Sequence, residues 1–240
     1  MEYARFNALK TVSDARESTF SVENVGPLTV TQDRSREPSY YNRIVGCTGD
    51  ALPWLDRALE HLGDGTSTLR IDVDMQELDA VAPALRERGF APGQELIWLA
   101  SRTGRRPCAA PVLKLGPDDA DRILPLLELE GPIASELWAL RRGHHCTERF
   151  RVFVVEVDDQ VVAMATTFVG ARGAVLGNAF TREEWRGRGF QAALLSARLA
   201  DADESHLEWV VTDVEPATAS LRNCERAGFV AELQLSLWER

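Results

Sequence analysis

Residues 181–195 read T-R-E-E-W-R-G-R-G-F-Q-A-A-L-L and join a strand-like run, residues 174–180, to a helix-like run, residues 190–202. Two glycines, Gly187 and Gly189, alternate with arginines at the join. The first N–H groups of a helix have no intrahelical partner and carry the positive end of its dipole. Together with the arginines, they predict a site for a phosphate or pyrophosphate. A plain strand-to-helix turn is the alternative that these residues alone leave open.

This turn differs from the common nucleotide-binding loops. The third glycine of the dinucleotide fingerprint G-x-G-x-x-G is missing, and no G-K-[ST] follows as in a Walker A loop. The turn resembles the acyl-CoA-binding motif Q/R-x-x-G-x-G/A of the Gcn5-related N-acetyltransferases, the GNAT family. Arg186 and Gly189 hold the first two fixed positions, and Gln191 stands where the family more often has Gly or Ala. The resemblance implies acetyl-CoA, or another acyl-CoA, as the cofactor.

A second block further along the chain supports the resemblance. Residues 207–214 are a strand candidate, Pro216 can open a helix, and Gly228 is placed to end it before Phe229 leads into a last strand. This order is similar to the C-terminal half of a GNAT domain. The resemblance places three residues of this helix beside the pantetheine arm and the phosphates: Ser220, Asn223 and Arg226.

The resemblance also assigns main-chain groups to the cofactor. The acyl-CoA arm is expected to lie in a gap between two splayed parallel strands. It should pair with the strand ahead of the turn, at Asn178, Ala179, Phe180 and Thr181. The pyrophosphate should meet the N–H groups of the turn, at Arg186, Gly187, Arg188, Gly189, Phe190 and Gln191.

Acyl transfer to an amine also needs a proton acceptor and a donor for the leaving thiolate. Many GNAT enzymes use a Tyr as general acid, and Cys224 occupies that position here. A thiol can donate a proton, or Cys224 can simply pack on the inner face of its helix. Asp213 lies at the C-terminal end of its strand, where ligand crevices open, and is our candidate base. Asn178 could polarise the acyl carbonyl or orient a water. The other acidic residues nearby are Glu183, Glu184 and Glu215.

The run R-R-G-H-H-C at residues 141–146 invites interpretation as a metal site. Adjacent His144 and His145 cannot share one face of a helix, and no further ligand follows at a suitable spacing. We therefore expect no metal. The arginines and histidines of this run bind an acidic acceptor or form a solvated surface, and the sequence leaves both open.

Composition is ordinary for a globular protein of 240 residues, which is long enough for one large domain or two small ones. A net charge of −10 argues against broad nucleic-acid binding. No apolar run reaches membrane-spanning length and no secretory signal is visible, so we expect no membrane partner. Scarce lysine beside plentiful arginine suggests a bacterial source. The scattered cysteines predict free thiols in a reducing cytoplasm: Cys47, Cys108, Cys146 and Cys224.

The polar, proline-containing run of residues 101–111 is the best linker candidate. We predict an N-terminal half over residues 1–104, a linker over 105–111 and a GNAT acyltransferase domain over 112–240. The expected fold is α/β (α+β), a mixed and mostly antiparallel sheet flanked by helices, in two tandem GNAT-like halves. A-L-R-E-R-G-F at residues 84–90 echoes N-C-E-R-A-G-F at 223–229. The N-terminal half is thus a degenerate GNAT-like domain, or else an unrelated α/β cap, without a CoA site.

Local patterns predict the remaining elements. In the N-terminal half, we expect strands over residues 20–25, 27–32, 43–47, 67–74 and 95–100, and helices over 51–61 and 76–88. In the C-terminal half, we expect a strand over 112–115, helices over 118–129 and 134–144, and a hairpin of 151–157 with 161–169.

These features predict an N-acetyltransferase that moves an acetyl group from acetyl-CoA to a primary amine of a small molecule. Two alternatives stay open. One is a GNAT-fold transferase with another donor, such as aminoacyl-tRNA, which the basic residues 102–106 could contact. The other is a non-catalytic acyl-CoA-binding module. The acceptor cannot be read from the sequence, and two halves in one chain favour a monomer over a homodimer.

Overall fold

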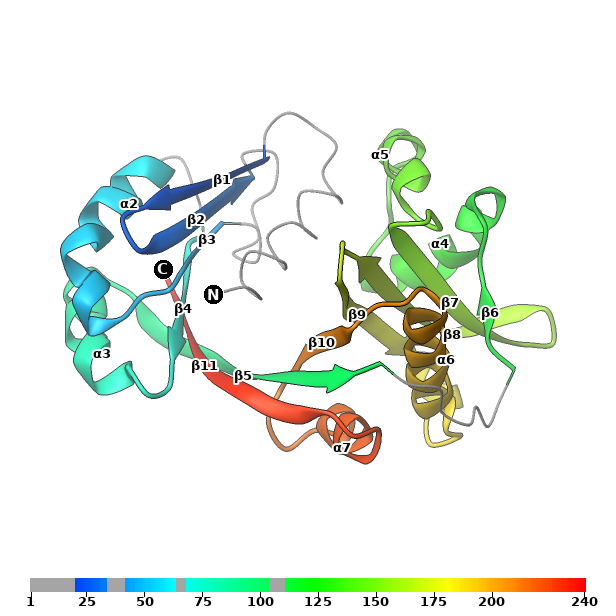
Figure 1. The fold of residues 1–240 in the computed structure, drawn as a ribbon. Helices are drawn as coiled ribbons and strands as arrows, with labels where there is room; N and C mark the ends of the chain where they lie inside the picture. The colour runs from blue at the N-terminus through cyan, green and yellow to red at the C-terminus, as the bar shows by residue number, and fades with distance from the viewer. Residues whose placement is uncertain (1–19, 34–41, 64–67, 104–110) are drawn as a thin grey trace. The chain divides into compact units, whose positions relative to one another are not determined.

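The computed structural model describes residues 20–33, 42–63, 68–103 and 111–240 (Figure 1). The chain divides into two compact units, each built from helices and a sheet. Unit 1 comprises Met1–Trp98, Val214–Pro216 and Ala231–Arg240, and unit 2 comprises Leu99–Asp213 and Ala217–Val230. Residues 105–110 of the predicted linker lie outside the described residues.

The sheet of unit 1 has the strand order β1-β2-β3-β4-β11-β5. Its strands β3 and β4 are parallel, whereas β1 with β2, β2 with β3 and β4 with β11 are antiparallel. The C-terminal strand of the chain therefore pairs in unit 1, because Leu237 lies opposite Asp72 of β4. The strands span Phe20–Val25 (β1), Leu28–Asp33 (β2), Arg43–Val45 (β3), Arg70–Asp74 (β4), Ala91–Arg102 (β5) and Val230–Glu239 (β11).

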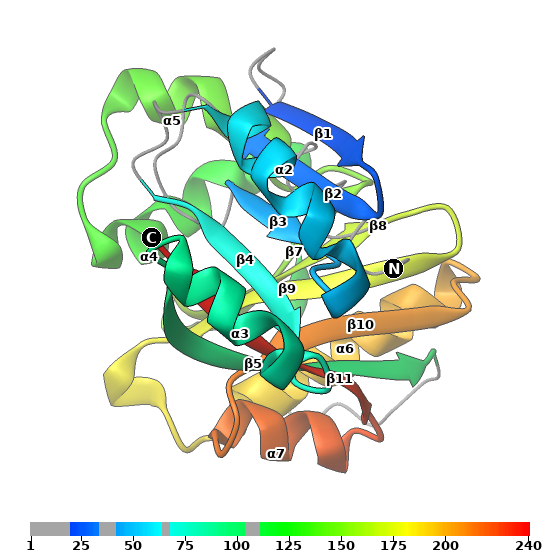
Figure 2. The ribbon, with the colours of Figure 1, turned by 90° about the vertical axis from the view of Figure 1, so that its left-hand side faces the viewer.

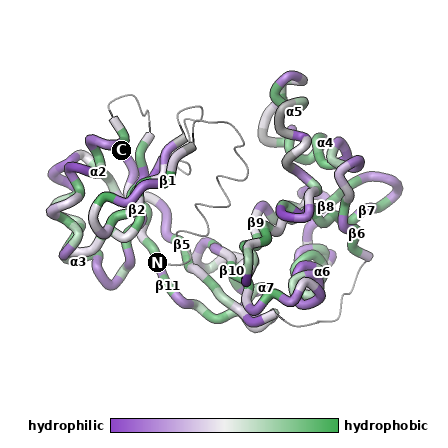
Figure 3. Tube along the Cα trace, turned by 45° about the horizontal axis from the view of Figure 1, so that its top comes forward, coloured by the Kyte–Doolittle hydropathy of each residue, from purple (hydrophilic) through white to green (hydrophobic). Residues whose placement is uncertain are grey.

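Two helices, α2 (Leu55–Leu62) and α3 (Leu78–Glu87), cover one face of this sheet (Figure 2). Hydrophilic and hydrophobic residues alternate along both helices (Figure 3), as expected for helices with one buried face. That face meets a single apolar cluster, in which Leu55, Leu85 and Ile71 are completely buried. The short helix η1 (Gly49–Trp54) precedes α2.

The sheet of unit 2 has the order β10-β9-β8-β7-β6, with the Leu99–Arg102 end of β5 also in this unit. All its strand pairs from β6 to β9 are antiparallel, and β9 with β10 is parallel. The strands span Leu113–Lys114 (β6), Phe150–Val157 (β7), Gln160–Val169 (β8), Gly173–Thr181 (β9) and Trp209–Val214 (β10). The helices are η2 (Pro117–Ile123), α4 (Leu124–Leu127), η3 (Glu128–Glu130), α5 (Ser135–Arg141), η4 (Arg142–His144), η5 (Glu183–Trp185), α6 (Phe190–Glu204) and α7 (Ala219–Arg226).

The alternation of side chains along β7 divides the core of unit 2 into two layers. Val152 and Val154 pack with η2, α4 and α5, whereas Phe153 and Val155 pack with Leu194 of α6 on the opposite face. Helix α6 therefore lies on one face of β7, β8 and β9. None of the helices in the described ranges is both long enough and apolar enough to span a membrane.

The two units share a local pattern. In unit 1 the parallel strands β3 and β4 flank η1 and α2, and in unit 2 the parallel strands β9 and β10 flank η5 and α6. The echoed G-F endings also fold alike. Phe90 N–H donates to Leu85 and Phe229 N–H to Cys224, both at 3.0 Å, and the glycine before each phenylalanine has a φ near +80°. This is a Schellman-type helix end, which explains the echo physically.

Three predicted helices have different limits in the structure. The stretch 118–129 is broken into η2, α4 and η3, because Pro125 lacks an N–H and its ring crowds the preceding turn. Pro53 likewise confines the first turn of 51–61 to a 3₁₀ helix. Helix α7 begins at Ala219 with Thr218 as its cap, because Ala217 has a left-handed φ of 61° that prevents a start at Pro216.

Candidate functional site

The parallel pairing of β9 and β10 ends well before β9 does. Its register runs from Trp209 opposite Gly173 to Val211 opposite Val175. At the next position the Thr212 hydroxyl donates to the Leu176 carbonyl at 3.0 Å, so a side chain replaces the strand ladder. Within the described chain, residues 177–181 have no register partner in β10. The main-chain groups on this edge of β9 are therefore not paired with β10, and the pairing of an acyl-CoA arm with them stays a prediction.

On its other edge, β9 pairs with β8 through a bulge. Met164 lies opposite Phe180 and Thr166 opposite Gly177, with the register shift between these pairs. Two residues of β9, Asn178 and Ala179, thus face one residue of β8. Asn178 has a φ of +46°, a left-handed conformation that is uncommon for a residue other than glycine. The bulge and the unpaired edge coincide at two of the predicted site residues.

The turn after β9 needs its glycines for conformation. Gly187 has a φ of +77° and Gly189 a φ of +81°, and a Cβ added at either would meet nothing within 4 Å. Gly189 is the N-cap of α6 and makes no side-chain capping bond. The first N–H groups of this 15-residue helix therefore point out of its N-terminus beside an uncrowded turn.

Two side chains tie this turn to the end of β9. Gln191 donates through Nε2 to the Thr181 hydroxyl at 2.7 Å, and Arg186 donates through Nε to the Thr181 carbonyl at 3.3 Å. Thr181 itself is buried. Gln191, which departs from the family pattern, thus has a structural partner on the strand that precedes the turn.

The second arginine of the turn lies on an aromatic ring. The Arg188 guanidinium carbon is 4.3 Å from the centre of the Trp185 ring, which in turn packs against Phe190. Cation–π contact restrains a side chain that would otherwise be free on an exposed turn. The positive charge is therefore held next to the N-terminus of α6.

The candidate residues of α7 form a polar surface. Ser220 and Arg226 are exposed, and Asn223 accepts a 2.6 Å hydrogen bond from the Arg226 guanidinium. The α7 N-terminus is capped by Thr218, whose hydroxyl accepts from Leu221 N–H. The contact of Ser220, Asn223 and Arg226 with the cofactor stays a prediction.

The proposed proton-transfer residues lie in different surroundings. Asp213 is half-buried on β10, two residues beyond the last register pair with β9, so it lies beside the start of the unpaired edge, level with Gly177. Cys224 is 5% exposed, and burial raises the pKa of its thiol to about 11 against the opposing influence of Arg198. A thiol of this pKa stays protonated at neutral pH. Glu183 and Glu184 are exposed on η5.

The run 141–146 contains two different environments. Arg142 forms a 2.9 Å ion pair with Asp121 at the surface. The His145 ring stacks on Trp138 and meets the edge of Phe150, each at 5.5 Å, so it belongs to an aromatic cluster instead of a solvated surface. The side chains of Arg141 and His144 lie outside the described residues. In the ranges that the structure describes, no three His, Cys, Asp or Glu side chains are grouped as metal ligands would be.

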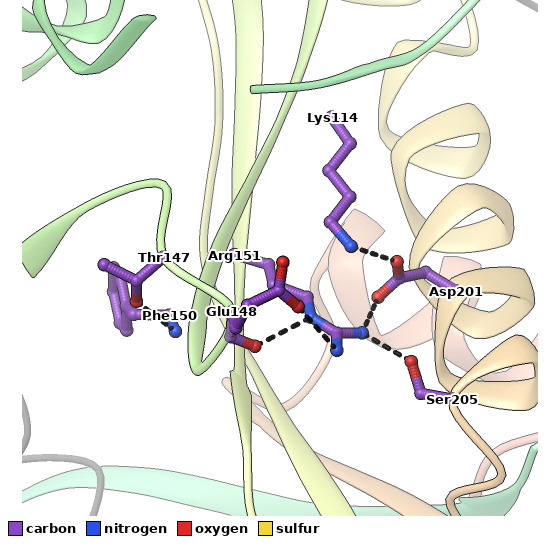
Figure 4. Close-up of polar contacts among 7 residues, drawn as sticks. All are labelled: Lys114, Thr147, Glu148, Phe150, Arg151, Asp201 and Ser205. Carbon is purple, nitrogen blue, oxygen red and sulfur yellow. Dashed lines mark hydrogen bonds and ion pairs between the residues drawn. The ribbon is translucent and has the colours of Figure 1, made fainter. Parts of the chain in front are cut away.

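A partly buried ionic network anchors the other end of α6 (Figure 4). Asp201 accepts from the Arg151 guanidinium at 2.5 Å and from the Lys114 ammonium at 2.8 Å, and Arg151 also donates to the Ser205 hydroxyl at 2.7 Å. The network joins α6 to β6 and β7. The helix that carries the turn is therefore fixed at its C-terminal end as well.

Sequence reasoning missed two buried residues whose side chains donate to main-chain carbonyls of β8 and β9, Arg198 and Thr212. Thr212 is a polar residue inside an apolar strand, and its partner could not be known without the pairing of β9 and β10. Arg198 had a clearer signal. It follows Leu194 and precedes Ala202 at intervals of one helical turn, so it interrupts an apolar stripe.

Comparison with solved structures places this architecture. A GCN5-related N-acetyltransferase from Kribbella flavida matches with a TM-score of 0.65 at 13% identity, over 98% of this chain and 94% of its own. A GCN5-related N-acetyltransferase from Sphaerobacter thermophilus matches with a TM-score of 0.61 at 16% identity, over 91% and 82%.

A tandem GNAT protein from the clavulanic acid biosynthesis pathway matches with a TM-score of 0.61 at 15% identity, over 97% of this chain and 87% of its own. No family model and no curated protein matches the chain. The predicted fold class is confirmed: the chain has the fold of the Gcn5-related N-acetyltransferases, a mixed and mostly antiparallel sheet flanked by helices, in a tandem arrangement.

Proposed function

We propose that this protein is an N-acyltransferase that transfers an acetyl group from acetyl-CoA to a primary amine of a small molecule. One observation carries the proposal. The unpaired edge of β9 at Ala179 leads directly into a turn whose Gly187 and Gly189 open the N-terminus of α6. A long donor with an amide arm and a pyrophosphate matches this sequence of groups. The GNAT fold of the solved structures supports the same activity.

Each part of the site suits a different chemical group of the donor. The N–H groups at the start of α6, with Arg186 and Arg188, suit a pyrophosphate. The main chain at Asn178 and Ala179 suits the amide groups of the arm. When bound, acetyl-CoA supplies its acyl group as a thioester. Asp213 flanks the unpaired edge and takes the proton that the acceptor amine loses when its nitrogen bonds to the acyl carbon, directly or through water. The C–S bond of the thioester breaks in this exchange, and solvent supplies the proton for the released thiolate.

Calorimetric titration with acetyl-CoA tests the cofactor. We expect saturable binding that is abolished by the double change Arg186→Ala and Gly189→Glu, because it removes a charge and places a carboxylate at the helix N-terminus. Lys114→Ala is the matched control, since it also removes a cation but lies in the network at the other end of α6. Absence of wild-type binding at millimolar acetyl-CoA would refute the proposal.

Thiol release from acetyl-CoA across a panel of small amines then tests catalysis. We expect release with at least one acceptor, and a strongly reduced rate for Asp213→Asn with unchanged acetyl-CoA affinity. We also propose that the protein acts as a monomer in the cytoplasm, which light scattering and cell fractionation would check.

A second candidate function is a non-catalytic acyl-CoA-binding module. It is favoured by one observation: Cys224 stands where many family members have a Tyr general acid, and its thiol is 5% exposed in the core. Binding of acetyl-CoA without thiol release for any amine would favour this module over the enzyme.

A further inference from the structure

Helix α6 buries one charged side chain among apolar ones. Its buried residues include Leu194, Leu195, Leu199 and Ala202, and Arg198 lies among them at 4% exposure. A buried guanidinium is costly unless it is well bonded, and burial lowers the pKa of Arg198 to about 10. The described residues contain no carboxylate that forms an ion pair with it. A packed apolar side chain at position 198 would stabilise this core more than a guanidinium does. The presence of Arg198 there therefore needs an explanation other than stability.

The partners of Arg198 are two main-chain carbonyls. Its Nε donates to Leu194, one turn earlier in the same helix, and its Nη1 donates to Thr166 of β8, both at 3.2 Å. The second bond leaves the helix and reaches the sheet. It therefore fixes α6 to one specific point of β8.

The hydrogen-bond pairing of β7 and β8 shows in which direction the Thr166 carbonyl points. Thr166 lies opposite Val152 of β7, and the Val152 carbonyl accepts from Leu115 N–H on the far side, at 2.9 Å. Main-chain groups of one residue in an antiparallel strand point to the same neighbour. Val152 thus points away from β8, and the Thr166 carbonyl points toward β9, where Gly177 and the bulge lie.

The bulge needs support from outside the two strands. Asn178 adopts φ +46°, a left-handed conformation that Asn reaches at lower cost than other non-glycine residues but that still has to be selected over extended backbone. The inserted residue also disturbs the ladder that would otherwise hold β8 to β9. Arg198 adds a charge-assisted bond to the strand opposite the bulge. Its Cα lies about 12 Å along α6 from Phe190, so one rigid helix links the bulge to the anion-binding turn.

We propose that Arg198 is a positioning residue that holds the β8–β9 bulge and thereby aligns the main chain of Asn178 and Ala179 toward the acyl donor. The proposal rests on the acyltransferase function proposed above. Arg198 touches no reacting atom in this scheme. Its role is to keep the donor-facing main chain in one conformation.

The test compares Arg198→Met, Arg198→Lys and the packing control Leu199→Met, which changes the neighbouring buried side chain without touching the bulge. For Arg198→Met we expect kcat for thiol release to fall by about 10- to 100-fold with an acetyl-CoA KM within a few-fold of wild type. Arg198→Lys should recover part of kcat, because an ammonium can donate to one of the two carbonyls. Leu199→Met should keep both constants near the wild-type values.

Hydrogen exchange provides a readout that is independent of activity. Amides of residues 177–181 should exchange faster in Arg198→Met than in wild type, whereas those at the start of α6 should not change. Wild-type kcat in Arg198→Met, or unchanged exchange at the bulge, would overturn the proposal. Equal losses of kcat in Arg198→Met and Leu199→Met would also overturn it, by showing a general packing role.

Two further outcomes are informative. If Arg198→Met does not fold, Arg198→Lys decides alone: a kcat equal to wild type overturns the proposal, and a lowered kcat with unchanged KM supports it. If wild-type protein neither binds acetyl-CoA nor releases thiol, the acyltransferase function fails, and the exchange experiment still shows whether Arg198 holds the bulge.

Discussion

The Gln191 side chain donates a 2.7 Å hydrogen bond to the hydroxyl of Thr181, across the turn that separates β9 from α6. This bond links the last residue of the strand to the first turn of the helix. It accounts for a polar residue at a position where the GNAT pattern has Gly or Ala.

We therefore predict that Gln191→Ala weakens acetyl-CoA binding although it restores a small residue. Loss of one hydrogen bond with a buried partner costs about 1 kcal/mol, which corresponds to an affinity about 5-fold lower. Calorimetry of Gln191→Ala, Thr181→Val and the double variant forms a double-mutant cycle. The double variant should bind no more weakly than either single one. Unchanged or tighter binding by Gln191→Ala would contradict this prediction.

Substitution of Gly189 should destabilise the protein because of the backbone conformation at this residue and not because of crowding. Its φ is +81° and an added Cβ meets nothing within 4 Å. Gly189→Ala should lower the free energy of unfolding by roughly 1–2 kcal/mol, and Gly189→Asn by less, because Asn tolerates the left-handed region. Gly143→Ala is the control, since it has equal space and no left-handed φ. Equal stability losses at the two positions, measured by chemical unfolding, would exclude this explanation.

The hydroxyl group of Thr212 should contribute to the free energy of unfolding. Thr212→Val keeps the shape of the side chain but leaves the Leu176 carbonyl without its 3.0 Å donor, at a cost of about 1–3 kcal/mol. Thr212→Ser keeps the donor and loses a methyl group, so it should be less destabilising. Denaturant unfolding of both variants checks the order. A larger loss for Ser than for Val would assign the effect to packing.

The ionic network at Asp201 should stabilise unit 2 more than a surface pair does. Asp201 and Arg151 have side chains only 14% and 9% exposed, so Asp201→Asn leaves a buried guanidinium poorly matched and should cost roughly 3 kcal/mol. Glu208→Gln breaks the exposed Arg172–Glu208 pair and should leave stability nearly unchanged. Thermal unfolding of both variants provides the comparison, and similar shifts would refute it.

Alkaline pH should destabilise the protein through its buried thiols. Burial raises the pKa of Cys47, Cys146 and Cys224 from 9.0 to about 11. The thiols ionise more readily in the unfolded chain, so their contribution is fully present below pH 9 and is lost as pH rises toward 11. Cys224→Ala should make this decline shallower, as measured by unfolding at several pH values. Arg198 acts in the opposite direction above pH 10, because burial lowers its pKa to about 10, and it interacts with Cys224, so the difference between the two proteins reports the Arg198–Cys224 pair. An equally steep decline in Cys224→Ala would contradict the assignment.

The parts of the fold that were predictable from sequence depend on local chemistry. A glycine with positive φ ends a helix or opens a turn whatever surrounds it. The sequence alone therefore predicted the G-F helix ends at Phe90 and Phe229 and the turn at Gly189. The predicted helix limits that differ from the structure also have a local cause. The broken helices at Pro53 and Pro125 follow from a missing N–H that hydrophobic periodicity does not register.

Tertiary structure decided the relationships between distant residues. Pairing of β11 with β4 places the last strand in unit 1 and not with the predicted domain of residues 112–240, because hydrogen-bond partners in a sheet are chosen by register and not by proximity in sequence. The early end of the β9–β10 ladder at Thr212 is a second case.

In unit 1 the Glu77 carboxylate accepts from Gly49 N–H at 3.0 Å, so the start of η1 is met by a side chain of the same unit. The sequence by itself determined the turn and the chemistry that it offers, since glycine conformation, arginine charge and helix polarity are local. Only the tertiary structure decided that one of the two similar helices opens on an unpaired strand edge, and that Arg198 supports that edge, because those contacts join segments that meet only when the sheet forms.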